Sequence, residues 1–122
     1  MKLTDRISIM AKLGSYMAEN SPEWEAAKDK AASENAWFIP AFIELSVENI
    51  HRHFLQPDLL QIWAEENKIP DIQPSPQKIG LLMAGNIPLV GFHDFLCIFM
   101  SGHMQKIKMS SRDSVLLQHL IH

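Results

Sequence analysis

The sequence feature that most constrains the fold is an apolar run, KIGLLMA at residues 78–84, which ends abruptly at Gly85-Asn86-Ile87-Pro88. Uninterrupted apolar runs of this length are typical of strands that are covered on both faces, as in parallel sheets. Proline is favoured in the first turn of a helix. We therefore predict a strand at 78–84 and a helix from Pro88 to about Ser101, which is apolar nearly all round and should be buried.

A second strand and helix are predicted directly afterwards. Gly102 ends the first helix, MQKIKM at 104–109 has strand length, and SSRD provides a capping serine for a last helix over 114–122. The order strand, helix, strand, helix is typical of a parallel α/β sheet with right-handed crossovers. Two strands do not complete such a sheet. Either the fold is small and unusual, or the chain is the front part of a longer protein, and we favour the second interpretation.

The first half of the sequence predicts helices instead. Apolar residues recur at steps of three and four, Ser21-Pro22-Glu23 is a helix-start pattern, and Pro40 and Pro57 open two further segments. We expect the three tryptophans to lie in this helical core; they are Trp24, Trp37 and Trp63. The proline-rich stretch 67–77 has no sustained period. The predicted organisation is a helical region at 1–66, a linker at 67–77 and an incomplete α/β unit at 78–122.

Composition excludes several classes of function. Of the 122 residues, 47% are hydrophobic and 20% charged, the net charge is −3, and the basic residues are scattered. We therefore expect no nucleic-acid binding. The first ten residues lack the pattern of a signal peptide, and polar residues interrupt the apolar stretch at 79–100. We expect a cytoplasmic protein without a membrane segment.

Asn86 is the residue most suggestive of chemistry. It follows the first predicted strand, and ligands of open α/β sheets bind beyond the carboxyl ends of the strands. A side-chain amide there can donate a hydrogen bond to an oxyanion that develops on a carbonyl. Alternatively, Asn86 is a structural residue that adopts an unusual backbone angle in a tight turn. The residues alone leave both interpretations open.

The remaining candidates favour structural roles. His51 and His53 are two apart on a predicted helix and point to nearly opposite sides, so they cannot share a metal. His93 and Asp94 are expected to pack or hydrogen-bond near the mouth of a pocket. Cys97, the only cysteine, lies between Leu96 and Ile98 in the predicted buried helix, so we expect an inert core residue and not a nucleophile.

One segment resembles a known family. GLLMAGNIPLVGFHDFLCIFMSGHMQKIKMSSRD, residues 80–113, resembles the first cofactor-binding unit of the aldehyde dehydrogenase superfamily, and most closely the fatty acyl-CoA reductases related to the luminescence reductase of bacteria. KLGSYM and ENAWFIPAFI in the first half resemble the same group. The resemblance implies an incomplete Rossmann-like β-α-β-α unit of the aldehyde dehydrogenase type.

The resemblance also implies an activity. The whole enzyme would reduce a fatty acyl thioester, carried by CoA or by a protein, to an aldehyde with NADPH, or alternatively with NADH. The family's catalytic cysteine lies far downstream and is not in this chain. We therefore expect the 122 residues alone to be inactive, and their exposed apolar surface to favour association.

The family's site residues map onto this sequence as follows. Asn86 matches the asparagine that stabilises the oxyanion, and Lys108 matches the lysine that binds the adenosine ribose or a 2′-phosphate near it. Arg112 replaces the usual acid, which favours NADPH. The other implied cofactor-binding residues are Met83, Ala84 and Gly85, through their backbone, and Ser110 and Ser111, beside the ribose.

A second hypothesis comes from another class of protein. The chain could instead be a non-catalytic helical interaction module that binds a partner protein or a second copy of itself. Asn86 would then be only a turn residue. Binding of a nicotinamide cofactor would distinguish the two hypotheses.

Overall fold

The computed structural model describes residues 1–121. His122, the last residue of the helix predicted over 114–122, lies outside the described part. This part of the chain is a mixed α/β structure of six helices and two strands. The elements are α1 Leu3–Ala18, α2 Pro22–Glu34, α3 Pro40–His53, α4 Pro57–Glu66, β1 Lys78–Leu82, α5 Phe92–Met100, β2 Met104–Lys108 and α6 Val115–Ile121.

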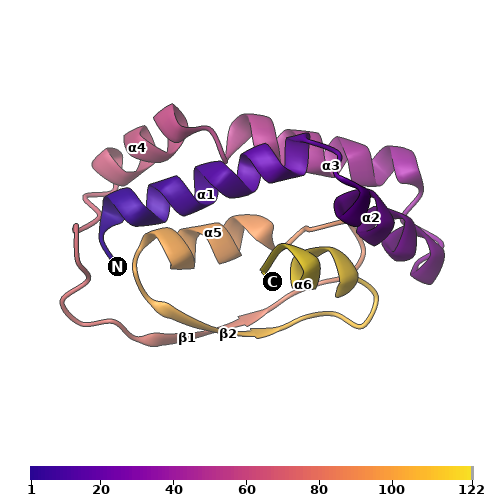
Figure 1. Ribbon diagram of the computed structural model, residues 1–122. Helices are drawn as coiled ribbons and strands as arrows, with labels where there is room; N and C mark the ends of the chain where they lie inside the picture. The colour runs from indigo at the N-terminus through magenta and orange to yellow at the C-terminus, as the bar shows by residue number, and fades with distance from the viewer. Residues whose placement is uncertain (122) are drawn as a thin grey trace.

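The helices and the sheet form layers (Figure 1). Helices α1, α3 and α4 lie together on the side farthest from the sheet, and α5 lies between α1 and the two strands, in contact with both. Helix α2 packs against α3 and α6. One hydrophobic core joins the two halves of the sequence, since buried residues of α1 and α2 belong to the same cluster as those of α5 and α6.

Local signals explain three of the helix starts. The Ser21 hydroxyl accepts a 3.2 Å hydrogen bond from the N–H of Trp24 and so caps α2. Pro22, Pro40 and Pro57 each occupy the first turn of their helix, where the missing N–H costs nothing. These three predicted helix starts are confirmed.

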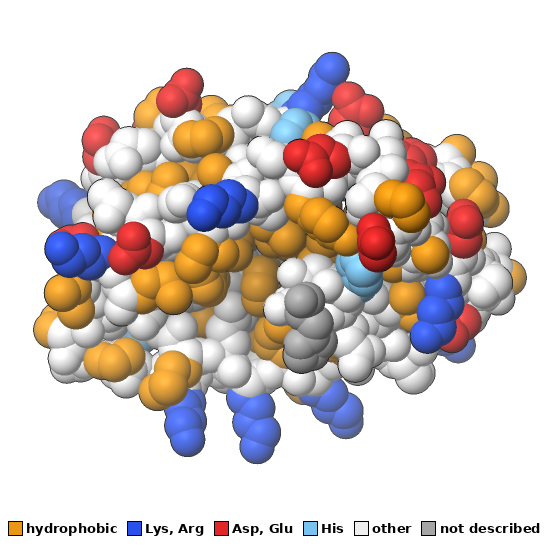
Figure 2. Space-filling view, viewed as in Figure 1, with side chains coloured by type: hydrophobic (Ala, Val, Ile, Leu, Met, Phe, Trp, Pro, Cys, Tyr) orange, Lys and Arg blue, Asp and Glu red, His pale blue; other side chains and the backbone are white. Residues whose placement is uncertain are grey.

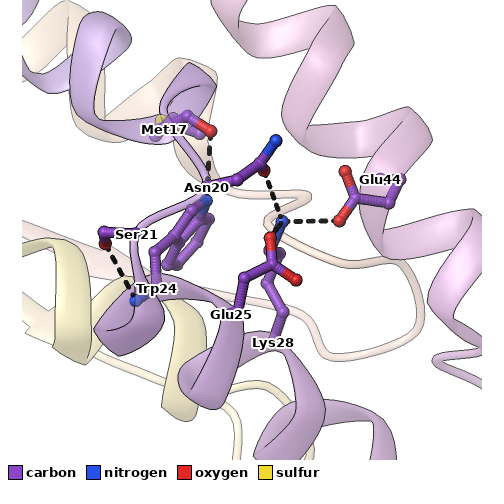
Figure 3. Close-up of polar contacts among 7 residues, drawn as sticks. All are labelled: Met17, Asn20, Ser21, Trp24, Glu25, Lys28 and Glu44. Carbon is purple, nitrogen blue, oxygen red and sulfur yellow. Dashed lines mark hydrogen bonds and ion pairs between the residues drawn. The ribbon is translucent and has the colours of Figure 1, made fainter.

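A buried lysine ties α2 to its neighbours (Figure 3). The Lys28 ammonium donates to the carboxylates of Glu25, at 2.7 Å, and Glu44 on α3, and it lies 5.6 Å from the ring centroid of Trp24. Burial lowers the pKa of Lys28, and the two carboxylates outweigh that effect, so the pKa is raised overall. The lysine therefore stays charged in its buried position.

A buried arginine joins the first helix to the second half of the chain. Arg6 on α1 donates from Nε to the carbonyl of Met100 at 3.0 Å and from Nη2 to that of Pro70 at 3.0 Å. Residues 67–77, between α4 and β1, contain no helix or strand. Because they lack a regular hydrogen-bonded ladder, contacts such as those of Arg6 fix their course.

The two strands are parallel, as predicted, with Lys78 opposite Met104 and Leu82 opposite Lys108. The prediction that the first strand is covered on both faces is wrong for the described residues. Both strands alternate between exposed and half-buried residues, and the side chain of Leu82 is 81% exposed. The reason is that α5 covers one face of the sheet and no described element covers the other.

The predicted helix start at Pro88 is also wrong. Residues 85–91 form turns, and α5 begins at Phe92. Leu89 adopts the left-handed conformation with φ 56°, which a continuous helix cannot accommodate. Helix α5 buries one face, formed by Phe92, Phe95, Leu96 and Met100. No helix of residues 1–121 is long and apolar enough to cross a membrane.

Candidate functional site

The candidate site lies where the two parallel strands end side by side. The N–H of Met83 donates to the carbonyl of Lys108 at 3.1 Å, directly after the last paired residues of the two strands. The segments 83–91 and 109–114 therefore leave the sheet at the same edge. The structure thus brings to one edge the predicted site residues at the ends of the two strands, namely Met83, Ala84, Gly85 and Asn86 from the first and Lys108, Ser110 and Ser111 from the second.

Gly85 is required by the close approach of these two segments. A Cβ atom at this position would lie 2.8 Å from the Cβ of Ser110 and 2.9 Å from the Cβ of Arg112, and it would collide with the Ser110 hydroxyl. Any other residue would push the second segment away. The glycine before Asn86 is therefore explained by contact between the two segments at the strand ends.

Asn86 is exposed and lies in the bend that follows β1. Its φ is not positive, since the left-handed residue of the segment is Leu89. Its side chain also has no hydrogen-bond partner among the described residues. A positive φ therefore does not explain the asparagine at this position, and its amide is accessible at the edge of the sheet.

Asn35, which the sequence analysis missed, holds the two segments together. It is 8% exposed and follows the last residue of α2. Its Nδ2 donates to the carbonyl of Arg112 at 3.0 Å and to that of Gly85 at 3.4 Å. Nothing in its local sequence distinguishes it from an ordinary asparagine at a helix end, so only the three-dimensional contacts could have identified it.

Asp113, also missed, shapes the segment that carries Asn86. Its Oδ2 accepts a 2.7 Å hydrogen bond from the N–H of Leu89, and its Oδ1 has no hydrogen-bond partner among the described residues. Asp113 is 7% exposed, and burial raises its pKa, an effect that the bond from Leu89 partly offsets. The carboxyl group thus provides the acceptor that the left-handed Leu89 needs.

The side of the site that follows β2 is basic. Lys108 is exposed, as are Lys106 on the same strand and Lys78 at the start of β1, and all three belong to the uncovered face of the sheet. Figure 2 shows basic side chains projecting from the molecule on the side where Figure 1 places the strands. The uncovered face carries no acidic residue. Such a face attracts anions, including phosphate groups.

The two serines differ in environment. Ser110 is half-buried, and its hydroxyl accepts a 3.2 Å hydrogen bond from the N–H of Arg112. Ser111 is exposed. The hydroxyl of Ser111 is therefore accessible to a ligand, whereas that of Ser110 already stabilises the turn.

The other candidates show no catalytic arrangement. Cys97 is half-buried instead of fully buried, and its Sγ lies 3.8 Å from the nearer ring nitrogen of His93. Burial, and then the nearby carboxylate of Asp94, raise the pKa of the thiol. A protonated thiol is a poor nucleophile. The described residues hold no group of three side chains that could bind a metal ion, so His51 and His53 are not part of one.

Comparisons with protein-family models, with curated proteins and with solved structures gave no match to this chain.

Proposed function

We propose that this chain forms the first part of an NADPH-dependent acyl-thioester reductase of the aldehyde dehydrogenase type. The observation that carries the proposal is the junction at the ends of the two parallel strands. There the free amide of Asn86 follows one strand, and Lys108 ends the other, with two serines after it. In open α/β sheets this edge is where nucleotides bind.

The basic residues favour a phosphorylated cofactor. Lys108 and Arg112 are both exposed and make no salt bridge with a described residue. The uncovered sheet face adds two more lysines and no acid. NADPH carries a phosphate that NADH lacks, so these cations favour NADPH. The cofactor would supply a hydride.

Asn86 would act on the acyl group. A cysteine thiolate from another part of the enzyme would attack the carbonyl carbon of a fatty acyl thioester, carried by CoA or a protein, and release the thiol. The carbonyl oxygen gains negative charge during this attack and again during reduction to the aldehyde. The amide of Asn86 would donate a hydrogen bond to that oxygen in both steps.

The test uses the native protein. An antibody against these residues isolates the polypeptide from its source cells, and a denaturing gel gives its mass. The purified protein is then incubated with a long-chain acyl-CoA and NADPH. We expect a mass several times 13.9 kDa and one aldehyde formed for each NADPH oxidised. A protein that oxidises no NADPH with any acyl thioester would refute the proposal.

An interaction module is the second candidate, and a specific observation favours it. Helix α3 and the turn before it expose four large apolar side chains, those of Trp37, Ile39, Phe42 and Leu45. Exposed apolar clusters often bind partner proteins or a second copy. An interaction module has no need for a cofactor. Absence of NADPH binding, together with a native mass of 13.9 kDa, would therefore favour this candidate.

A further inference from the structure

Trp37 occupies an unexpected position beside the candidate site. We expected it in the helical core, but its side chain is 62% exposed. It lies in the turn between α2 and α3, and its N–H donates to Oδ1 of Asn35 at 3.0 Å. The next residue, Phe38, is fully buried and anchors the turn. The backbone that carries the indole is thus anchored on both sides, by Asn35 and by Phe38.

Arg112 reaches this indole from the other half of the chain. The guanidinium carbon of Arg112 lies 5.6 Å from the ring centroid of Trp37, which is within the range of a cation–π contact. Asn35 binds the backbone of both residues, since it also donates to the carbonyl of Arg112 at 3.0 Å. One buried amide therefore positions an exposed aromatic ring and an exposed guanidinium together at the sheet edge.

We propose that Trp37 and Arg112 form a binding site for a phosphorylated adenosine, with the base stacked on the indole and a phosphomonoester bound by the guanidinium. An exposed aromatic face stacks on any base. A planar guanidinium with no carboxylate partner suits a phosphate, which it can bind through two parallel hydrogen bonds. The inference rests on the proposed function, because it assigns the adenosine 2′-phosphate end of NADPH to these two residues.

The site draws on both halves of the chain. Trp37 belongs to the region predicted as the helical domain, whereas Arg112 follows β2. The helical region would therefore take part in cofactor binding as well as packing against the sheet unit. A purely structural Trp37 would instead be covered by protein, and its removal would change association but not nucleotide affinity.

The experiment measures nucleotide binding, not activity. The native protein and its variants are titrated by calorimetry with NADPH, NADH and adenosine 2′,5′-bisphosphate. Trp37→Ala should weaken all three by about tenfold or more, the usual effect of losing one stacked base. Trp37→Phe should keep most of the affinity. Arg112→Ala should weaken NADPH and the bisphosphate by about tenfold and leave NADH unchanged.

A matched control comes from α3. Phe42 on α3 is also an exposed aromatic residue, but it makes no cation–π contact with a described residue. Phe42→Ala should leave all three affinities unchanged. Circular dichroism of each variant checks that the fold is intact.

The outcomes separate this inference from the proposed function. If the native protein binds NADPH and Trp37→Ala binds it equally well, the inference is overturned and the proposed function stands. If the bisphosphate binds through Trp37 and Arg112 but no acyl thioester is reduced, the inference stands and the proposed function falls. A native protein that binds none of the three nucleotides overturns both. A Trp37→Ala variant that changes only self-association overturns the inference alone.

Discussion

The carboxylate of Asp113 accepts a 2.7 Å hydrogen bond from the backbone N–H of Leu89, which lies 24 residues earlier in the chain. Leu89 is the left-handed residue of the segment that carries Asn86. A non-glycine residue in this conformation costs about 1–3 kcal/mol and persists only where its surroundings hold it. Asp113 therefore sets the path of the segment between β1 and α5.

Removal of this carboxylate should destabilise the protein. Asp113→Ala leaves the N–H of Leu89 buried without an acceptor, which costs about 1–3 kcal/mol of the free energy of unfolding. Asp113→Asn keeps an acceptor oxygen and removes the buried charge, so its stability at neutral pH should be close to or above that of the original protein. Urea unfolding measures both. Equal stability of the Ala and Asn variants would contradict the role of this hydrogen bond.

The same residue predicts a dependence of stability on pH. Burial raises the pKa of Asp113 in the folded state, so the folded protein holds this proton more tightly than the unfolded chain does. The contribution of Asp113 is therefore fully present below the unfolded pKa of about 3.9, and it is lost as the pH rises through the folded pKa. The free energy of unfolding of the original protein, relative to that of Asp113→Asn, should therefore fall as the pH rises from the unfolded pKa through the folded pKa of Asp113. A difference that stays constant with pH would show that the pKa is not raised.

Arg6 should contribute strongly to the connection between the two halves of the chain. It is 2% exposed and donates to three carbonyls of the second half, those of Pro70, Asp71 and Met100. Arg6→Ala leaves the carbonyl of Met100 without this donor and should cost about 3 kcal/mol in urea unfolding. Arg6→Lys should not restore the stability, since an ammonium cannot reproduce the guanidinium fork.

The matched control for Arg6 is Arg52, which is exposed and pairs with Glu48 one turn away on α3. Arg52→Ala should cost less than about 0.5 kcal/mol, as is usual for exposed pairs on a helix. Similar losses for the two alanine variants would mean that the Arg6 contacts contribute little.

Lys108 should contribute to cofactor affinity and not to stability. It is exposed and pairs with no carboxylate among the described residues, so Lys108→Ala should leave the urea midpoint nearly unchanged. In fluorescence titrations of the native protein the variant should bind NADPH more weakly, by about tenfold. Lys78→Ala, on the same uncovered face but at the opposite end of the strands, is the control and should bind normally. Equal affinity of Lys108→Ala and the unaltered protein would remove Lys108 from the site.

The sequence predicted those parts of the fold that depend on local signals. Ser21 and Pro22 lie next to each other, and a capping hydroxyl and a proline act within one turn of the helix that they start. The parallel pairing of the two strands was likewise predictable, because each apolar strand precedes a helix and such units pair in parallel.

The parts that were not predicted depend on residues far apart in the chain. Helix α5 begins at Phe92 and not at the predicted Pro88, because the carboxylate of Asp113, 24 residues away, holds Leu89 in a left-handed conformation. The backbone of Trp37 is likewise bound by Asn35, whose side chain also binds the segment after β2. Neither contact leaves a periodic or short-range signal in the sequence.

For the candidate site, the sequence indicated which two segments lie together but not how exposed their residues are. The segments at Asn86 and Lys108 do meet at one edge, because the ends of neighbouring parallel strands must do so. The apolar residues around Asn86 did not indicate that this segment lies at the surface, where Asn86 is exposed. Ile87, for example, is itself exposed.

The most direct test of the central claim is the turnover of the native protein with Asn86→Ala, measured with a long-chain acyl-CoA and NADPH. The side chain of Asn86 has no partner among the described residues, so its removal should leave the fold intact and the dissociation constant of NADPH nearly unchanged. Loss of one oxyanion donor typically lowers turnover by about 10²–10³, and we predict a decrease of that size. A variant that turns over as fast as the unaltered protein would contradict the assignment of Asn86 as the oxyanion donor.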